Sequence, residues 1–545
     1  MKKLFDSASV KAADAMAMKL GGLKETELVK RAAEALYKYV AERIIKTGSK
    51  KIAVVCGSYN NGADGYALSR LLCERKRELG FTGQAETYVI ALDDPCSGAA
   101  IITAAEAKAA GCVIRAYSPS EGKRLAEADI IVDCILGTGT DTSRHIDERL
   151  KELIADINSS DALKISCDVP TGVSSDNGSV LTDINYNADE NVNSAVCVKA
   201  DETCSFILQK AGLAVTPGML YAGKQAILDF DFPPEAVSLS GIRSYLVDDE
   251  AFNLLPTRNI YANKGTYGTL LSLCGSPDMP GASYMAAYAA LRTGVGLVCA
   301  AADKYTLSIL KQRVSEPVFI ILPNMCVNQR EAKLCSDALI KIKTKLTAVL
   351  CGCGIGMKGG IIDLITNLCD ETEKNIPMIL DADALNLLSA DEYKDIKKAF
   401  FTKHGDRTII TPHPGEAARL LGIDTEKVNA DRIGSARRLS EMTGGVAVLK
   451  GYRTVTAAPG GDVYINPTGN DGMAKGGSGD VLAGIIAGLA AQGTGLVRSA
   501  VTGVYIHGMC GDRAAEKLGK RFMLPTDMIS CLSEILMLAD KNLKE

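Results

Sequence analysis

The glycine-rich run at residues 469–480 carries the strongest chemical signal in the chain. It reads Gly-Asn-Asp-Gly-Met-Ala-Lys-Gly-Gly-Ser-Gly-Asp and leads directly into an apolar helical stretch. Glycines let successive backbone N–H groups converge, and a helix N-terminus adds more, so the run is suited to hold a phosphoryl group. Asp480 could take a proton from a hydroxyl nucleophile, or it could only satisfy the helix N-terminus. The run lacks the Gly-Lys-Ser/Thr ending of a Walker loop.

Three apolar segments in the first half each end in polar residues and a glycine-containing loop. Residues 52–56 lead into 57–65, residues 131–136 into Gly-Thr-Gly-Thr at 137–140, and residues 165–168 into Val-Pro-Thr-Gly at 169–172. In parallel sheets ligands bind at the carboxyl ends of strands, so the three loops predict one shared pocket. Taken singly, an Asn/Gly loop could be a plain turn, and Asp168 could only cap a local N–H group.

Apolar strand-like segments alternate with helical ones along the whole chain, which predicts an α/β fold with mostly parallel sheets covered on both faces. Prolines at 233, 234 and 256 interrupt this pattern, so we expect two domains, 1–240 and 241–545. Helices are predicted at 1–47, 65–79 and 282–292. Strands are predicted at 52–56, 87–92, 130–136, 163–167, 269–273, 295–300, 318–322, 348–351, 378–380, 408–410 and 446–449, with a hairpin at 455–465.

The composition is typical of a globular protein and limits the kinds of partner that the chain is expected to bind. The 545 residues are 47% hydrophobic and 23% charged, with a formal net charge of −4 and no basic stripe, so nucleic acid is not an expected partner. No apolar window reaches about 18 residues, and no apolar run follows the basic start, so neither a membrane span nor a signal peptide is expected. The 17 cysteines include no Cys-x-x-Cys pair; buried thiols in the cytoplasm are expected, with a zinc site as the alternative.

The first half resembles the NAD(P)H-hydrate epimerase family over about residues 10–235, through the three loops above and Lys199–Gly212. The resemblance implies a Rossmann-like three-layer fold that binds a hydrated dinucleotide, with Asp168 as acid/base. This sequence departs from the family at Ala63, Thr171, the loop 140–144 and the extra polar stretch 185–193. Substrate contacts are implied for Asn60, Asn61, Gly62, Ala63, Asp64, Gly137, Thr138, Gly139, Thr140, Asp141, Thr142, Ser143 and Asp168, and potassium ligands for Asn61, Asp133 and Thr171.

The second half resembles the ribokinase-like NAD(P)H-hydrate dehydratases over about residues 245–540, through Gly352–Gly356, Leu380–Asn386, Thr411–Glu416, Leu449–Gly451 and the glycine-rich run. The resemblance implies an α/β/α fold with Asp480 as base. Lone His413 could equally be structural. Substrate contacts are implied for Ala282, Gly356, His413, Pro414, Gly415, Glu416, Ala417, Ala418, Arg419 and Asp480, and nucleotide contacts for Lys450, Gly451, Tyr452, Arg453, Thr454, Asn470, Gly476, Gly477, Ser478 and Gly479.

Together the two resemblances imply a cytoplasmic enzyme that interconverts the R and S hydrates of NADH and NADPH and dehydrates the S form. The dehydratase would use Mg²⁺ and a nucleotide: ADP giving AMP and phosphate, or ATP. A homo-oligomer is expected. One alternative is a ribokinase-superfamily small-molecule kinase. Another is a first half without catalysis that only binds a dinucleotide or forms oligomers, because its loops differ at Ala63 and 140–143.

Overall fold

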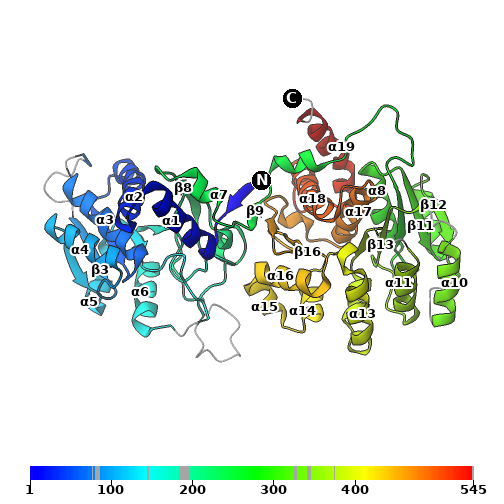
Figure 1. Ribbon diagram of the computed structural model, residues 1–545, viewed down its shortest axis with the longest axis horizontal. Helices are drawn as coiled ribbons and strands as arrows, with labels where there is room; N and C mark the ends of the chain where they lie inside the picture. The colour runs from blue at the N-terminus through cyan, green and yellow to red at the C-terminus, as the bar shows by residue number, and fades with distance from the viewer. Residues whose placement is uncertain are drawn as a thin grey trace. The chain divides into compact units, whose positions relative to one another are not determined.

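The computed structural model describes residues 1–76, 78–79, 86–143, 146–182, 195–323, 328–340, 345–372 and 375–542 (Figure 1). Arg144 and the stretch 185–193, two of the departures noted above, lie outside these residues. The chain divides into two compact units, Lys3–Ser244 and Tyr245–Glu545, with Met1–Lys2 belonging to the second.

The first unit is built on a sheet of seven described strands in the order β4-β3-β2-β5-β6-β7-β8, with every neighbouring pair parallel. Predicted strands coincide with β2, β3, β5 and β6, whereas β4, β7 and β8 were missed because they carry charged or polar residues. The bounds are β2 (Lys51–Cys56), β3 (Glu86–Ala91), β4 (Val113–Ala116), β5 (Ile130–Cys134), β6 (Leu163–Cys167), β7 (Glu202–Phe206) and β8 (Lys224–Leu228).

Helices cover both faces of this sheet. Alternate residues of β2 point to opposite sides: Ile52 and Val54 pack with α2, α3 and α4, whereas Ala53 and Val55 pack with α6. Helix prediction over 1–47 was wrong for residues 2–4, which form β1. The helices are α1 (Ser7–Gly21), α2 (Glu25–Thr47), α3 (Asn60–Glu74), α4 (Gly98–Ala109), α5 (Pro119–Arg124), α6 (Glu148–Ser159) and α7 (Pro234–Ser238).

The larger sheet has eleven described strands in the order β1-β9-β18-β17-β16-β15-β14-β13-β10-β11-β12. Strands β10–β16 pair in parallel, and β16, β17 and β18 form an antiparallel ribbon that confirms the predicted hairpin. The bounds are β1 (Lys2–Leu4), β9 (Ser244–Leu246), β10 (Thr269–Leu273), β11 (Leu297–Ala302), β12 (Val318–Ile321), β13 (Ala348–Cys351), β14 (Met378–Leu380), β15 (Thr408–Ile410), β16 (Val446–Leu449), β17 (Val455–Ala457) and β18 (Val463–Ile465).

Helices α8, α17 and α18 lie on one side of this sheet and α11, α13 and α16 on the other (Figure 1). The first three pack against Leu270, Leu350 and Ile379. No helix of the described residues has the length and apolarity to cross a membrane. The bounds are α8 (Pro280–Arg292), α9 (Lys304–Arg313), α10 (Gln329–Ile340), α11 (Gly360–Glu371), α12 (Asp383–Ser389), α13 (Lys394–His404), α14 (Pro414–Leu421), α15 (Thr425–Ala430), α16 (Arg432–Thr443), α17 (Ser478–Ala491), α18 (Leu496–Leu518) and α19 (Pro525–Asn542).

Gly62 allows α3 to approach the end of β2, and we predict that the Gly62→Ala variant has a lower free energy of unfolding than the natural protein. A Cβ at this position would lie 1.9 Å from the carbonyl oxygen of Gly57. Overpacking of this kind costs about 3 kcal/mol, more than the roughly 1 kcal/mol that Ala gains over Gly in a helix. Equilibrium urea unfolding measures the difference. Gly98→Ala is the matched control, since nothing lies within 4 Å of that position; equal losses in the two variants would contradict the prediction.

Candidate active sites

The first unit holds a cavity of about 560 Å³ at the carboxyl ends of β2, β5 and β6, closed on another side by α1 and α2. All three polar strand ends contribute to it, as their placement in a parallel sheet requires. Eight of the residues predicted to contact substrate line this cavity, namely Asn60, Asn61, Asp64, Gly137, Thr138, Gly139, Thr140 and Asp168.

The remaining predicted contacts in this unit do not line the cavity. Helix α3 begins at Asn60, five residues earlier than predicted, so residues 60–64 form its first turn rather than a loop. Asn61 and Asp64, three residues apart, face the cavity, whereas Gly62 and Ala63 are buried toward the core. Asp141, Thr142 and Ser143 bond instead among themselves and to Ser179, with Thr142 Oγ1 and Ser179 Oγ 2.7 Å apart.

Four charged residues of the cavity were not among the predicted site residues, namely Lys11, Asp14, Glu25 and Lys210. Lys210, whose side chain is only 2% exposed, forms an ion pair with Asp168 and donates to the carbonyl oxygen of Phe206 at 3.2 Å. Asp168 itself adopts φ 67°, in the left-handed region. Lys210 was quoted above only within the segment 199–212 that carries the resemblance, and Asp14 gave no sequence signal, because α1 reaches the cavity only in the folded chain.

Carboxyl groups of this cavity differ in how readily they ionise. Burial, and then the negative charges of Asp168 and Asp14, raise the pKa of Asp64 well above its usual range. Burial and the charge of Asp168 raise the pKa of Asp14 to about 6, against the lowering effect of Lys210. A protonated carboxyl group beside a lysine-paired carboxylate can deliver and accept protons near neutral pH, so the cavity is suited to general acid–base chemistry.

Asp133 lies under the cavity floor and accepts four hydrogen bonds. Thr171 donates to it through its hydroxyl at 2.6 Å and its amide at 2.9 Å, and Ser166 Oγ and the Ile135 amide supply the others. The Thr171 hydroxyl also accepts from the Leu136 amide at 3.0 Å. The amide nitrogen of Asn61, the third residue of the predicted cation site, is buried and has no hydrogen-bond partner among the described residues. The four donors occupy the lone-pair positions of Asp133, so its carboxylate is a neighbouring charge rather than an open ligand.

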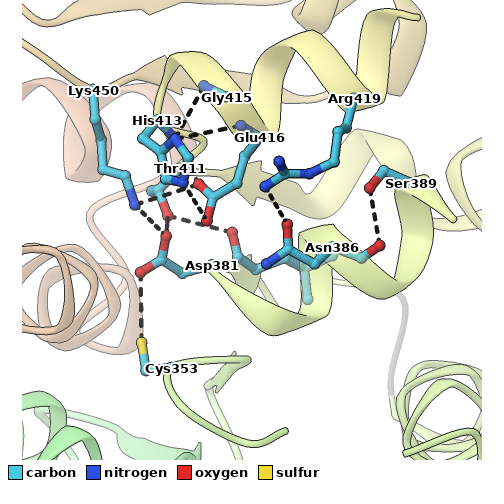
Figure 2. Close-up of polar contacts among 11 residues, drawn as sticks. Cys353, Asp381, Asn386, Ser389, Thr411, His413, Gly415, Glu416, Arg419 and Lys450 are labelled. Carbon is cyan, nitrogen blue, oxygen red and sulfur yellow. Dashed lines mark hydrogen bonds and ion pairs between the residues drawn. The ribbon is translucent and has the colours of Figure 1, made fainter. Parts of the chain in front are cut away.

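In the second unit an ion pair joins the ends of β14 and β16, which lie on either side of β15. Lys450, after β16, donates to Asp381 Oδ1 at 2.6 Å, and Thr411, after β15, donates to the same oxygen at 2.8 Å. Figure 2 shows these contacts and, on the other side of Asp381, the thiol of Cys353, whose sulfur lies 3.6 Å from Oδ2. Lys450 Nζ also lies 3.8 Å from Glu416 Oε2. Asp381 and Thr411 were quoted above only as parts of motifs, and Cys353 was missed as a chemical group.

The predicted segment 413–419 forms the first turns of α14. His413 caps this helix: its Nδ1 accepts from the amides of Gly415 at 3.0 Å and Glu416 at 3.4 Å, and Glu416 Oε2 accepts from the His413 amide (Figure 2). Burial lowers the pKa of His413, which keeps the ring neutral and able to accept. His413 therefore caps α14 through Nδ1, and its Nε2 lies 3.4 Å from Glu416 Oε1. Ala417 and Ala418 are buried in the fold.

Arg419 and Gly356 are held by polar residues that follow β14. Arg419 is exposed and donates to Asn386 Oδ1 at 2.8 Å (Figure 2). The Gly356 amide donates to Asp383 Oδ2 at 2.8 Å. Ala282, predicted on the substrate side, is buried beside Gly354, where an added Cβ would lie 2.9 Å from its own.

The glycine-rich run ends as expected in the N-terminus of a helix, α17. Gly477, at φ 101°, is its N-cap, and Asp480 is the third residue of the helix. A Cβ built on Gly479 would lie 3.5 Å from Lys450 Nζ and 3.8 Å from Asp381 Oδ2, so the run lies beside the ion pair. Nothing lies within 4 Å of a Cβ built on Gly476, which leaves room there. The loop thus adds free backbone N–H groups to the same site.

Several residues predicted to contact a nucleotide make bonds within the protein. Asn470 donates to Asp512 at 2.9 Å and accepts from the Gly472 amide, and the Ser478 hydroxyl donates to the Met473 carbonyl. The Thr454 hydroxyl closes a turn on the Gly451 carbonyl at 2.9 Å. Tyr452 is 55% exposed, and the Arg453 guanidinium lies 5.8 Å from the centre of its ring.

Asp480 has the environment of a general base. Burial, and then the negative charge of Asp381, raise its pKa to about 7, against the lowering effect of Lys450. A carboxylate with a pKa near the working pH combines a sizeable ionised fraction with good basicity. The second unit therefore offers a base, a buried cation and an anion-binding loop in one place, which is the equipment for phosphoryl transfer.

Comparison with known proteins agrees with both halves of this description. Residues 25–212 match the family profile of the YjeF-related protein N-terminus, and residues 270–534 match that of NAD(P)H-hydrate dehydratase. The chain is 34% identical to the bifunctional NAD(P)H-hydrate repair enzyme Nnr of Moorella thermoacetica, over 92% of this chain and 89% of that one. It is also 34% identical to the enzyme of the same name from Coxiella burnetii, over 97% and 98%.

Among solved structures, the chain is similar to the ADP/ATP-dependent NAD(P)H-hydrate dehydratase of Bacillus subtilis, which was co-crystallised with ATP and Mg²⁺. The two are 28% identical, and the match covers 54% of this chain and 98% of that one with a TM-score of 0.47.

The Thr171 hydroxyl holds the floor of the first cavity, and we predict that Thr171→Val lowers the free energy of unfolding of its unit by about 2 kcal/mol. The change leaves Asp133 and the Leu136 amide each without one hydrogen bond while conserving volume. Chemical denaturation followed by far-ultraviolet circular dichroism measures the loss. Thr171→Ser, which keeps the hydroxyl, should stay within about 1 kcal/mol of the natural protein. Equal losses for Val and Ser would show that the hydroxyl carries no stability.

Proposed function

The chain belongs to the family of bifunctional NAD(P)H-hydrate repair enzymes, and we propose from this how its two sites divide the work. It is an epimerase and a dehydratase of hydrated NADH and NADPH. We assign epimerisation to the unit Lys3–Ser244 and dehydration to the unit Tyr245–Glu545. The observation that carries this division is the presence of a separate set of acid–base groups in each unit, Asp64, Asp168 and Lys210 in one and Asp480 with Lys450 in the other.

Dehydration requires a better leaving group than hydroxide. In the proposed reaction Asp480 takes the proton of the C6 hydroxyl while the hydroxyl oxygen attacks the terminal phosphorus of the nucleotide. The new oxygen–phosphorus bond replaces the bond to the nucleotide. The ring nitrogen then expels phosphate, and loss of a proton from C5 restores the double bond. Lys450 and the amides of Gly476, Gly477 and Gly479 are placed to bind the phosphoryl oxygens.

Mg²⁺ would accompany the nucleotide, because this ion is commonly held by substrate phosphates and water with few protein ligands. When bound, it screens the phosphate charges. Regarding the donor, we propose ADP, giving AMP and phosphate, on the resemblance alone. Of the predicted nucleotide contacts, the backbone of the glycine run and the exposed Tyr452 have free surface for it, whereas the Asn470 side chain is engaged with Asp512.

Inversion at C6 requires one bond of that carbon to break and re-form. In the proposed reaction the C6 hydroxyl loses its proton and becomes a carbonyl as the bond from C6 to the ring nitrogen breaks and the nitrogen takes up a proton; addition of the nitrogen to the other face of the carbonyl reverses these transfers. We assign the acid/base role to Asp168, which Lys210 holds in position from beneath. Because a dehydratase site shaped for one epimer leaves the other unused, the two sites on one chain together allow complete recovery of the cofactor.

Potassium stays a proposal for the first cavity. The amide oxygen of Asn61, whose side chain lines the cavity, and the remaining lone pair of the Thr171 hydroxyl would suit a hard cation, and the Asp133 carboxylate supplies the compensating charge without an open ligand position. We also propose a homo-oligomer and a cytoplasmic location. The location rests on the described cysteines, which are free thiols and mostly buried, as in a reducing compartment.

Neither alternative weighed from the sequence is favoured. A ribokinase-type small-molecule kinase would account for Asp480 and its loop but not for relatives that match over 97% of this chain. A silent first half would not account for the acid–base groups gathered in its cavity.

We predict that Asp480→Asn abolishes dehydration and spares epimerisation, and that Asp168→Asn does the reverse. Each amide keeps the shape of the side chain and removes its ability to take a proton. The assay mixes a defined mixture of NADH hydrate epimers with Mg²⁺ and either ADP or ATP and follows NADH absorbance, with chromatography for the epimers. The natural protein should recover both epimers completely. Near-normal dehydration by Asp480→Asn would refute the assignment of the base, and unchanged epimer exchange by Asp168→Asn would refute that of the acid/base.

Dehydration should depend on pH with an inflection near pH 7. The base acts as the carboxylate, and burial raises the pKa of Asp480 to about 7, so kcat/KM for the pure S epimer should rise as pH increases through this value. Removing the Lys450 charge, which lowers this pKa, should move the inflection to higher pH in Lys450→Met. A profile that stays flat between about pH 6 and 8.5 would exclude Asp480 as the base.

A further inference from the structure

Three potential metal ligands converge at the carboxyl edge of the larger sheet. Among the described residues, the Cys353 sulfur and one carboxylate oxygen each of Asp381 and Asp480 lie within 4.8 Å of one another. Cys353 and Asp381 are fully buried, and Figure 2 shows the thiol pointing at the Asp381 carboxylate. The arrangement combines one soft ligand, the sulfur, with two hard ones, the carboxylate oxygens. The proposed dehydration gives the thiol no role, so that reaction does not explain why the thiol lies here.

The spacing of these atoms suits a tetrahedral metal. With zinc–sulfur and zinc–oxygen bonds of about 2.3 and 2.0 Å, a tetrahedral site places sulfur and oxygen about 3.5 Å apart. The Cys353 sulfur lies 3.6 Å from Asp381 Oδ2. Lys450 and Thr411 occupy Oδ1 of that carboxylate and leave Oδ2 to face the thiol.

The Cys353 thiol is fixed from its other side. The Cys274 thiol forms a hydrogen bond with that of Cys353, and the Gly275 amide donates to the Cys353 carbonyl at 2.7 Å, which ties the ends of β10 and β13 together. One sulfur and two carboxylate oxygens leave the fourth position of a tetrahedral metal to water.

The local charge also suits a divalent cation. A Cys353 thiolate with the carboxylates of Asp381 and Asp480 carries three negative charges, and Lys450 contributes one positive charge. A divalent ion brings the group to neutrality, which matters for charges taken out of water.

We propose that Cys353, Asp381 and Asp480, with water in the fourth position, form a binding site for a thiophilic divalent metal of the zinc class, and that occupancy blocks dehydration. The site stands on the geometry alone. The block rests on the proposed function, because the metal would occupy the oxygen of Asp480 that must accept the hydroxyl proton. Mg²⁺ does not compete well for such a site, since it prefers six oxygen ligands and avoids thiolate.

Binding breaks the S–H bond of Cys353, forms a metal–sulfur bond and releases the thiol proton to solvent. Because binding releases a proton, affinity should weaken as the pH is lowered.

The test uses the full chain, reduced and free of metal. Cadmium, a spectroscopic substitute for zinc, should produce the ultraviolet charge-transfer band of a metal–thiolate bond, and competition with a zinc chelator gives the zinc affinity. Cys353→Ser should remove most of the band and weaken zinc at least about tenfold. Cys96→Ser, which removes an exposed thiol, is the matched control and should change neither. A band of equal strength in Cys353→Ser, or none in the natural protein, would overturn the site.

Dehydration is then measured at constant Mg²⁺ with buffered zinc, and each variant is compared with its own metal-free rate. The natural protein and Cys96→Ser should be inhibited over the zinc range in which the site fills, and Cys353→Ser should need at least about tenfold more zinc. Zinc binding without inhibition would refute the proposed inhibition of dehydration but not the metal-binding site. Absence of hydrate turnover in the metal-free natural protein would instead count against the proposed function, while the thiolate band would still decide on the site.

Discussion

Both units depend on one constraint of parallel sheets: each strand must be followed by a crossover that returns the chain to the same starting edge. Every loop that leaves a strand end therefore opens on one side of the sheet. This constraint brings Asn61, Gly137 and Asp168 to one cavity in the first unit. In the second it brings Asp381, Thr411 and Lys450 into hydrogen-bonding contact, although up to 69 residues separate them along the chain. Neither site could be built from a continuous segment of sequence.

Because the strand ends converge, charged groups lie out of water, and in each unit a lysine pairs with the buried carboxylate. Lys210 faces Asp168 in one unit and Lys450 faces Asp381 in the other. Removing a single partner from a buried pair typically lowers the free energy of unfolding by 3–5 kcal/mol. These lysines and their carboxylates therefore contribute to stability as well as to function. The carboxyl groups next to each pair, Asp64 and Asp480, then meet a fixed negative neighbour that makes ionisation harder. Through this effect a structural ion pair can set the protonation of a catalytic group.

Sequence patterns predicted the strands of the second unit best. Strands β10, β13, β14, β15 and β16 have the predicted bounds, because each is a short apolar run ended by Gly, Asp, Pro or Lys. The start of α3 was misplaced, since Asn-Asn-Gly-Ala-Asp-Gly has the composition of a loop and only packing against β2 makes it a helical turn. Asp14 and Lys210 could not be predicted as site residues, because their position follows from how α1 and the chain after β7 fold onto the sheet. The thiol of Cys353 looked like one more buried cysteine until its carboxylate neighbours were known.

The left-handed backbone of Asp168 has a consequence for the history of the protein. A non-glycine residue in this region costs roughly 1 kcal/mol, and at φ 67° a glycine would be at ease. The ion pair with Lys210 outweighs this strain, so stability alone would keep the aspartate for as long as the lysine is present. A descendant that lost its need for the first reaction would therefore be expected to lose the lysine and the aspartate together, because losing either one alone leaves an unpaired buried charge.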